Sequence, residues 1–229
     1  LASGTPLAIV VLGLLINEKV DVLNLGAEGM LLVGAVTGFA VAFHTHSVVL
    51  ALLGGAAAAA VVAAVFGWLV IWINANQYAT GLAVSLFGGG FSAFVGVAYV
   101  GQKLGDPVSY VVPVLGDIPF IGPALFRQHP MVYLTVLAVA AVAWFFYRTR
   151  AGLVLRAVGE SPESAHSIGY PVISIRFGAV AFGGAMAGIA GAYLSTVYTP
   201  LWVQNMSAGR GWIAVALVAF ASWKPARLM

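Results

Sequence analysis

The stretch Val48-Val-Leu-Ala-Leu-Leu-Gly-Gly-Ala-Ala-Ala-Ala-Ala-Val-Val-Ala-Ala-Val-Phe-Gly-Trp-Leu-Val-Ile-Trp-Ile73 decides the fold class, because it contains no charged and no hydroxyl-bearing side chain. A helix needs about 20 apolar residues to cross roughly 30 Å of hydrocarbon. Inside lipid, only helices and closed barrels satisfy their own backbone hydrogen bonds, and nothing here shows the alternation of a barrel strand. Further stretches of this kind are Ala79–Val100, Pro130–Tyr147 and Phe177–Tyr198. The sequence therefore predicts several transmembrane helices.

The composition agrees with a protein that lies in a lipid bilayer. Of its 229 residues, 62% are hydrophobic and 7% are charged, whereas a soluble domain carries about 25% charged residues. We therefore expect residues 1–229 to form a single transmembrane domain. The net charge of +3 does not indicate nucleic-acid binding. The absence of cysteine excludes disulfides, thiolate metal sites and cysteine nucleophiles.

The N-terminal part of the chain is apolar but interrupted. Pro6–Ile16 and Leu25–Phe43 are apolar segments joined by polar residues, which predicts a broken N-terminal helix. The last apolar segment, Trp212–Trp223, is too short to span a membrane alone. Small residues recur four positions apart in the expected helices, so the backbones of neighbouring helices can approach closely. These residues are Gly34 and Gly38, then Gly88, Ser92 and Gly96, and finally Gly184, Gly188 and Ala192. We expect an all-α bundle.

The distribution of basic residues predicts the orientation of the helices. The connection Arg148–Arg176 holds four of the ten basic residues, whereas Gly101–His129 holds two, together with two aspartates. Since cytoplasmic loops are enriched in Lys and Arg, the first connection is expected inside and the second outside, with an irregular backbone. Following the chain backwards places Asn74–Tyr78 inside and His44–Ser47 outside.

The basic connection contains the signals of a short helix. Ser161 is a good N-cap residue, and Pro162 occupies the first helical position. Glu163 complements the helix dipole in the first turn, and Gly169 ends the helix. The sequence predicts about two helical turns at the cytoplasmic face. Such a helix is either an ordinary loop feature or the element through which a soluble motor acts on the membrane domain.

The chain shows no signature of an enzyme. A phosphate-binding loop needs Gly-x-x-x-x-Gly-Lys followed by Ser or Thr, but the three lysines are followed by Val, Leu and Pro. Nucleotide hydrolysis would have to come from another subunit. His44 and His46 are close in sequence but lack a third ligand nearby, so we predict no metal site. We also predict no catalytic residues.

Four ordered motifs resemble those of a known family. They are Val22-Leu-Asn-Leu-Gly-Ala-Glu-Gly-Met-Leu-Leu-Val-Gly-Ala35, Asn76-Gln-Tyr-Ala-Thr-Gly-Leu82, Arg148-Thr-Arg-Ala-Gly-Leu-Val-Leu-Arg-Ala-Val-Gly-Glu160 and Asn205-Met-Ser-Ala-Gly-Arg-Gly-Trp-Ile-Ala214. Together they resemble permease subunits of bacterial ABC importers, in the nucleoside and simple-sugar branch related to the ribose and branched-chain amino-acid permeases. The resemblance covers nearly the whole chain.

The resemblance implies a set of partners and a coupling helix. The partners are an ATP-binding cassette ATPase that holds the ATP, a second permease subunit and an extracytoplasmic solute-binding protein. The implied location is the bacterial cytoplasmic membrane, which the chain crosses several times. Members of the family are longer, so we expect this chain to be a fragment that lacks C-terminal helices. The residues implied to dock on the ATPase are Arg156, Gly159, Glu160, Ser161, Pro162, Glu163, Ser164, Ala165, His166, Ile168 and Gly169.

Polar residues within apolar stretches are candidates for the translocation path, because ionisable groups at membrane depth are costly. Glu28, with Asn24, either lies near this path or serves the fold by pairing with a buried donor or capping a helix. Asn76 and Gln77 either line the path or cap the helix that they begin. Asn205 and Arg210 lie between helices, where Arg210 could complement Glu28 or contact the binding protein.

Three function classes follow from these observations. The first is an ABC importer permease whose solute is a nucleoside or a simple sugar. The second is an ion-coupled secondary transporter in which Glu28 is the coupling site at a discontinuous helix. The third is a membrane scaffold without transport activity. A neighbouring ATPase and binding protein would favour the first class, and gradient-driven activity of the chain alone would favour the second.

Overall fold

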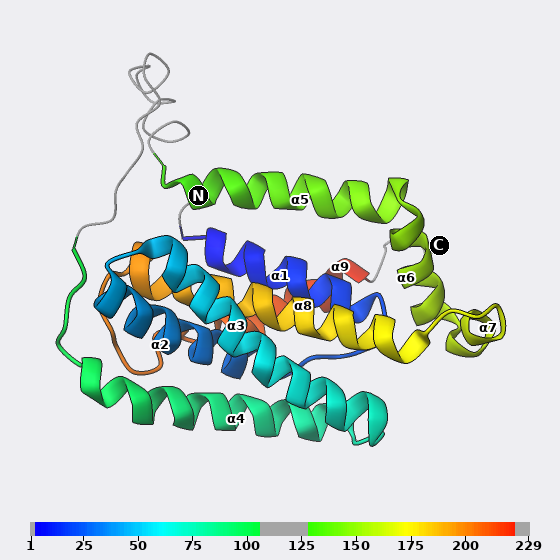
Figure 1. Ribbon diagram of the computed structural model, residues 1–229, viewed down its shortest axis with the longest axis horizontal. Helices are drawn as coiled ribbons and strands as arrows, with labels where there is room; N and C mark the ends of the chain where they lie inside the picture. Colours follow the sequence, from blue (N-terminus) through cyan, green and yellow to red (C-terminus); the bar gives the residue numbers. More distant parts are fainter. Residues whose placement is uncertain (1–2, 106–127, 223–229) are drawn as a thin grey trace, which may run out of the picture.

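The computed structural model describes residues 3–105 and 128–222, and these residues form an all-helical bundle (Figure 1). Most of the expected outer connection, Gly101–His129, lies outside the described residues. In chain order the helices are α1 (Thr5–Glu18), α2 (Ala27–Thr45), α3 (Val48–Gly67), the π-helix η1 (Trp68–Trp72), α4 (Gln77–Gly96), the 3-10 helix η2 (Val97–Tyr99), α5 (Pro130–Arg148), α6 (Arg150–Glu160), α7 (Pro162–Ser167), α8 (Val172–Tyr193), the π-helix η5 (Leu194–Tyr198) and α9 (Arg210–Ser222).

Five of the described helices are long and apolar enough to cross a membrane. They are Ala27–Thr45, Val48–Trp72, Gln77–Tyr99, Pro130–Arg148 and Val172–Tyr198. Two apolar helices are shorter, namely Thr5–Glu18 and Arg210–Phe220. At 1.5 Å per residue, the first covers about 21 Å and the second about 16 Å of a hydrocarbon layer about 30 Å thick. The prediction of a multi-pass helical membrane protein is confirmed.

The helices connect at the two ends of the bundle as the orientation requires. In Figure 1, α3 ends and α4 begins at the same end as α6 and α7. At the opposite end, the hydroxyl of Tyr99 lies 3.4 Å from Nε2 of His44, and Lys103 pairs with Leu201 in an isolated bridge. The connections expected inside and those expected outside therefore lie at opposite ends of the bundle.

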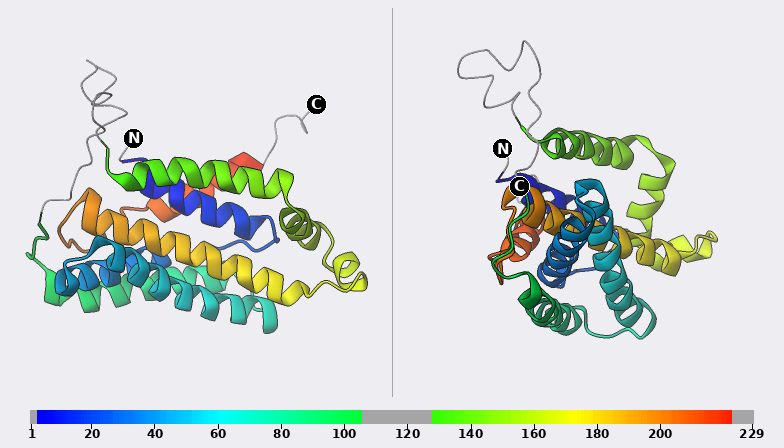
Figure 2. Two further views of the ribbon diagram at one scale, coloured as in Figure 1. Left: turned by 45° about the horizontal axis from the view of Figure 1, so that its top comes forward. Right: turned by 60° about the vertical axis from the view of Figure 1, so that its left-hand side comes forward.

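Helix α8 occupies the middle of the bundle, where it contacts α1, α2 and α3 (Figure 2). The close approach depends on the small residues expected from the sequence. A Cβ atom on Gly34 would overlap Gly188 on α8, and one on Gly38 would overlap Ala192. Gly88 on α4 lies in the same way against Gly29 on α2. Small side chains therefore set the helix spacing around α8.

The outer helices expose apolar side chains, as a surface in contact with lipid requires. On α4, Leu86 is 78% exposed and Phe94 is 83% exposed. Helix α5 lies along α1 at the edge of the bundle, and the chain passes from it through α6 and α7 to the start of α8 (Figure 2). In contrast, α2 is buried along most of its length, and the buried residues include Glu28 in its first turn.

Candidate functional site

The polar break predicted between the two N-terminal segments is residues 19–26, which contain no helix. Helix α1 ends at Glu18, and α2 runs back in the opposite direction from Ala27 (Figure 1). Asp21 holds the turn with a positive φ of 59°. The backbone N–H of Val22 donates to the carbonyl of Asn17 at 3.1 Å. The break is thus an ordered reversal of the chain.

Side chains from two distant helices hold the backbone of the break. Arg176 on α8 donates through Nε to the carbonyl of Val20 at 2.9 Å and through Nη2 to the carbonyl of Asp21 at 3.1 Å. Nη2 also lies 3.3 Å from Oδ2 of Asp21, which forms a salt bridge. From α4, Oε1 of Gln77 accepts the N–H of Leu23 at 2.7 Å. These contacts satisfy backbone groups that the break leaves without helical partners.

Asn24 lies near the end of the break, three residues before α2 begins. Its side chain is 3% exposed, and its Oδ1 accepts the N–H of Gly26 at 3.0 Å. Its Nδ2 faces the sulfur of Met30 at 3.5 Å. The hydroxyl of Ser85 on α4 donates to the carbonyl of Leu25 at 2.7 Å. The entry into α2 is therefore fixed on both sides.

Glu28 joins the first turn of α2 to the start of α9. Its side chain is 7% exposed. Oε1 accepts hydrogen bonds from the hydroxyl of Ser207 and from the N–H of Gly209 at 3.1 Å, and Oε2 accepts from the N–H of Gly211 at 2.6 Å. A carboxylate is favourable at a helix N-terminus because it satisfies free N–H groups and complements the helix dipole. The carboxylate thus lies in the first turn of α2 and accepts hydrogen bonds from the residues at the start of α9.

Glu28 therefore pairs with buried donors of the chain itself, which is the structural role that the sequence analysis left open beside a role in the translocation path. Its role in a translocation path stays a prediction. Arg210 does not complement Glu28 by direct contact in the part of the chain that the structure describes. Its Nη1 donates to the carbonyls of Met206 and Ser207, and its guanidinium lies 5.9 Å from the ring centre of Tyr198.

The remaining path candidates fall in separate places. Asn76 caps α4, because its Oδ1 accepts from the N–H groups of Tyr78 at 2.9 Å and Ala79 at 3.1 Å. Gln77 reaches the break instead of capping its own helix. Asn205 is exposed in the connection before α9, with a positive φ of 57°. The structure thus brings Asn24 and Gln77 together at the break, with Glu28 just after it. Arg210 belongs to the segment whose backbone binds Glu28, and Asn76 and Asn205 lie outside this group.

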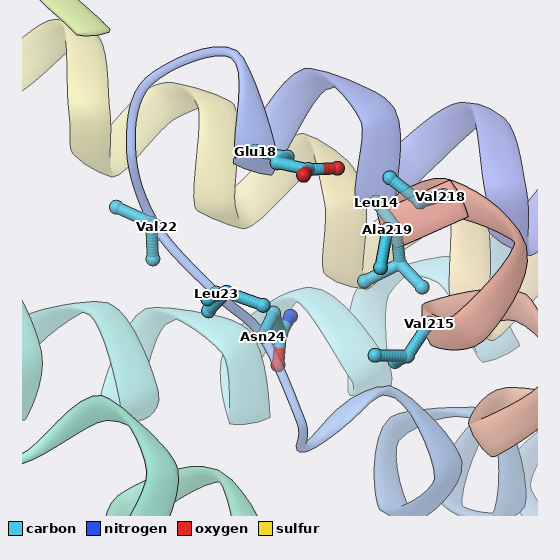
Figure 3. Close-up of a pocket in the computed structure, with 8 residues that line it drawn as sticks. All are labelled: Leu14, Glu18, Val22, Leu23, Asn24, Val215, Val218 and Ala219. Carbon is cyan, nitrogen blue, oxygen red and sulfur yellow. The ribbon is translucent and has the colours of Figure 1, made fainter. Parts of the chain in front are cut away.

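A small cavity of about 20 Å³ lies between the break and α9 (Figure 3). Such a volume holds about one water molecule. Glu18 and Asn24 lie on the side of the break, and the apolar side chains of Val215, Val218 and Ala219 face them from α9. Oε2 of Glu18 is buried and has no hydrogen-bond partner among the described residues. The cavity is therefore polar on one wall only.

The basic connection between α5 and α8 contains two helices, α6 and α7, where one was predicted. Helix α7 begins at Pro162 and ends before Gly169, whose φ is 95°, as predicted. Ser161 precedes it, but its hydroxyl bonds to that of Ser164 at 2.7 Å instead of capping the backbone. Helix α6 was not predicted. Its signal in the sequence is Thr149, whose hydroxyl accepts the N–H of Gly152 at 3.0 Å.

Helix α6 touches the polar break directly, which no sequence motif indicated. A Cβ atom on Gly159 would overlap the carbonyl oxygen of Lys19 and lie 3.1 Å from Cα of Val20. Val158 beside it is fully buried. The implied coupling residues thus divide between the end of α6, which packs on the break, and α7, which projects from the bundle (Figure 1).

Comparisons with known proteins agree with this architecture. The family model described as "Branched-chain amino acid transport system / permease component" matches residues 1–228. A putative glucose ABC transporter permease protein of Haloferax volcanii is 43% identical, and the match covers 99% of this chain and 70% of the relative. A guanosine ABC transporter permease protein of Bacillus subtilis and a nucleoside ABC transporter permease protein of Lactococcus lactis are each 28% identical, with 98% of this chain and 74% of each relative covered.

No solved structure matches the chain significantly. The family assignment therefore depends on the sequence matches, which extend over both the break and the cytoplasmic helices. The helix content and the five apolar helices are those of a multi-pass membrane protein. The chain belongs to the family of permease components of branched-chain amino acid transport systems.

Proposed function

We propose that this chain is the permease subunit of an ATP-driven importer for nucleosides or simple sugars. The observation that carries the proposal is the pair α6 and α7, which join the apolar bundle to an exposed cytoplasmic surface within a chain of this family. Glu163, Ser164 and His166 are exposed on α7. We infer the substrate class from the relatives described above, which are glucose, guanosine and nucleoside permeases.

The work of transport comes from partners in this proposal. An ATP-binding cassette ATPase docks on α7 and hydrolyses ATP, because the chain itself contains no phosphate-binding loop. A second permease subunit completes the membrane domain, and an extracytoplasmic solute-binding protein delivers the solute. The chain needs no cofactor of its own. The complex lies in the cytoplasmic membrane of the cell, which we expect to be bacterial.

Among the path candidates, Asn24 has the strongest support. It is buried, its Nδ2 lies 3.5 Å from the sulfur of Met30, and it lines the cavity between the break and α9 (Figure 3). Buried polar groups with weak partners are costly, so their presence favours a functional role. Glu28 contributes by fixing the start of α9, which forms the opposite wall of this cavity.

Replacement of Glu163–Ile168 by a Gly/Ser linker of equal length tests the docking role of α7. We expect the full-length wild type to copurify with its neighbouring ATPase and the linker variant to lose it, because the linker removes both the helix and its side chains. The measurement is the amount of ATPase recovered per permease. If the linker variant retains the ATPase, α7 is not the docking element.

A matched pair of point variants makes this test more specific. Ile168 is 75% exposed just after α7, and Ile173 is 47% exposed at the start of α8. Burial of an isoleucine side chain in an interface contributes about 1.5–3 kcal/mol. We therefore expect Ile168→Ser to weaken ATPase binding about tenfold or more, whereas Ile173→Ser leaves it unchanged. Equal effects of the two variants would count against a specific contact at α7.

A further inference from the structure

The polar break is where α4, α6 and α8 meet. Gly159 of α6 packs directly on the backbone of Lys19 and Val20. Arg176 of α8 donates to the carbonyls of Val20 and Asp21, and Gln77 of α4 accepts the N–H of Leu23. At Gly159 the backbone of α6 lies directly against the backbone of the break, because glycine has no side chain to separate them. A displacement of α6 at this point therefore acts on the backbone of the break as well as on the side chains packed around it.

The bonds from Arg176 to the backbone of the break contribute more than its ion pair with the side chain of Asp21. Its side chain is 21% exposed, whereas that of Asp21 is 75% exposed. An exposed ion pair contributes little because water and salt screen it. The two bonds to carbonyl oxygens use the fixed geometry of the guanidinium, which a lysine cannot reproduce in full. Arg176 therefore ties the base of α8 to the same backbone on which α6 rests.

The other end of the break is attached just as firmly. Asn24 and the hydroxyl of Ser85 fix the entry into α2, and Glu28 follows within its first turn. The carboxylate of Glu28 holds Ser207, Gly209 and Gly211 at the start of α9. A continuous set of contacts thus runs from α6 through the break to the N-terminus of α9.

We propose that Arg176 and Gly159 are positioning residues that transmit movement of α6 and α7 to the starts of α2 and α9. This inference rests on the proposed function, since it assumes that an ATPase moves the cytoplasmic helices. Rigid elements with direct contacts can carry coupling between distant sites when both sites bias their arrangement. In this chain the transmitted change reaches the wall of the cavity that Asn24 lines.

The proposal predicts that Arg176→Gln separates ATPase binding from the response to ATP. The readout is Ala208→Cys, at an exposed position just before α9; residues 1–229 contain no cysteine, and any cysteine elsewhere in the full-length protein is replaced by serine. The full-length protein in complex with its ATPase is treated with a water-soluble maleimide, with and without ATP and orthovanadate. We expect the labelling rate to change at least threefold with ATP in the otherwise unaltered protein and by less than 1.5-fold in Arg176→Gln.

Two further variants are compared with Arg176→Gln. Gly159→Ala places a Cβ atom against the backbone of Lys19, so α6 must shift on the break, and we expect a smaller ATP-dependent change in the fraction that size-exclusion chromatography recovers as folded complex. Arg176→Lys can donate to one carbonyl at a time and is expected to restore part of the change. Arg148→Gln removes one exposed positive charge at the same end of the bundle and should behave like the unaltered protein.

The outcomes separate this inference from the proposed function. If the unaltered protein binds no ATPase, the proposed function fails. If the unaltered protein binds the ATPase and responds to ATP, but Arg176→Gln responds equally, the positioning role alone is overturned. It is also overturned if Arg176→Gln and Gly159→Ala lose the ATPase or unfold, or if Arg176→Lys recovers nothing, because Arg176 then serves only the fold.

Discussion

Replacing Glu28 with glutamine is expected to lower the free energy of unfolding of the protein by about 2–4 kcal/mol, because hydrogen bonds to a charged acceptor are the strong ones and buried donors left without an acceptor are costly. The glutamine amide retains one acceptor oxygen but points an NH₂ group toward either Gly211 or Gly209, whose N–H groups now bind the carboxylate. The start of α9 loses part of its attachment to α2. The measurement is thermal unfolding of the purified full-length protein in detergent.

Glu18→Gln is the matched control for this experiment. It makes the same chemical change in the helix before the break, but Oε2 of Glu18 is buried without a hydrogen-bond partner among the described residues. Removing its charge should leave stability unchanged or raise it slightly, since an unpaired buried oxygen costs less in a neutral amide. Equal stability of Glu28→Gln and the wild type would contradict the structural role assigned to Glu28.

Replacing Gly188 with valine should have an effect at least as large. A Cβ atom at this position overlaps the carbonyl oxygen of Gly55 on α3, and Gly34 on α2 packs against the same backbone. Overpacking usually costs about 1–3 kcal/mol and sometimes more. Here the obstacles are backbone atoms that cannot rotate away. We therefore expect a loss of about 3 kcal/mol or more, seen as a strongly reduced yield of folded protein in size-exclusion chromatography.

Gly178→Val provides the control on the same helix. A Cβ atom there has no neighbour within 4 Å, so the larger side chain meets open space. It carries the same intrinsic effect of valine in a helix but no steric overlap. A similar yield for Gly178→Val and Gly188→Val would show that the close packing of α8 does not determine stability.

The membrane-spanning helices could be predicted from the sequence because their signal is local. Length and apolar composition were enough for Val48–Trp72 and Pro130–Arg148, whose bounds agree closely with the prediction. The pairing of small residues such as Gly34 with Gly188 could be anticipated only as a tendency. The four-residue spacing identifies a face that can pack closely, but it does not identify the partner helix.

The contacts that organise the break could not be predicted in the same way. Arg176 and Asp21 are separated by 155 residues, and Glu28 reaches donors 179 to 183 residues away. No periodic pattern connects such positions, so Arg176 entered the sequence analysis only as one of several basic residues. Helix α6 was missed for another reason. Its arginines and its lower hydrophobicity made it look like part of a polar loop.

Solute uptake by proteoliposomes tests the central claim most directly. The full-length protein is reconstituted with its neighbouring ATPase, second permease and binding protein, and uptake of labelled guanosine and glucose is measured. We expect uptake of one of these solutes. This uptake should require both ATP and an ATPase that can hydrolyse ATP, and it should persist when ionophores collapse the proton and sodium gradients. Uptake by the permease chain alone, driven by a proton or sodium gradient without ATP, would contradict it and favour the ion-coupled alternative.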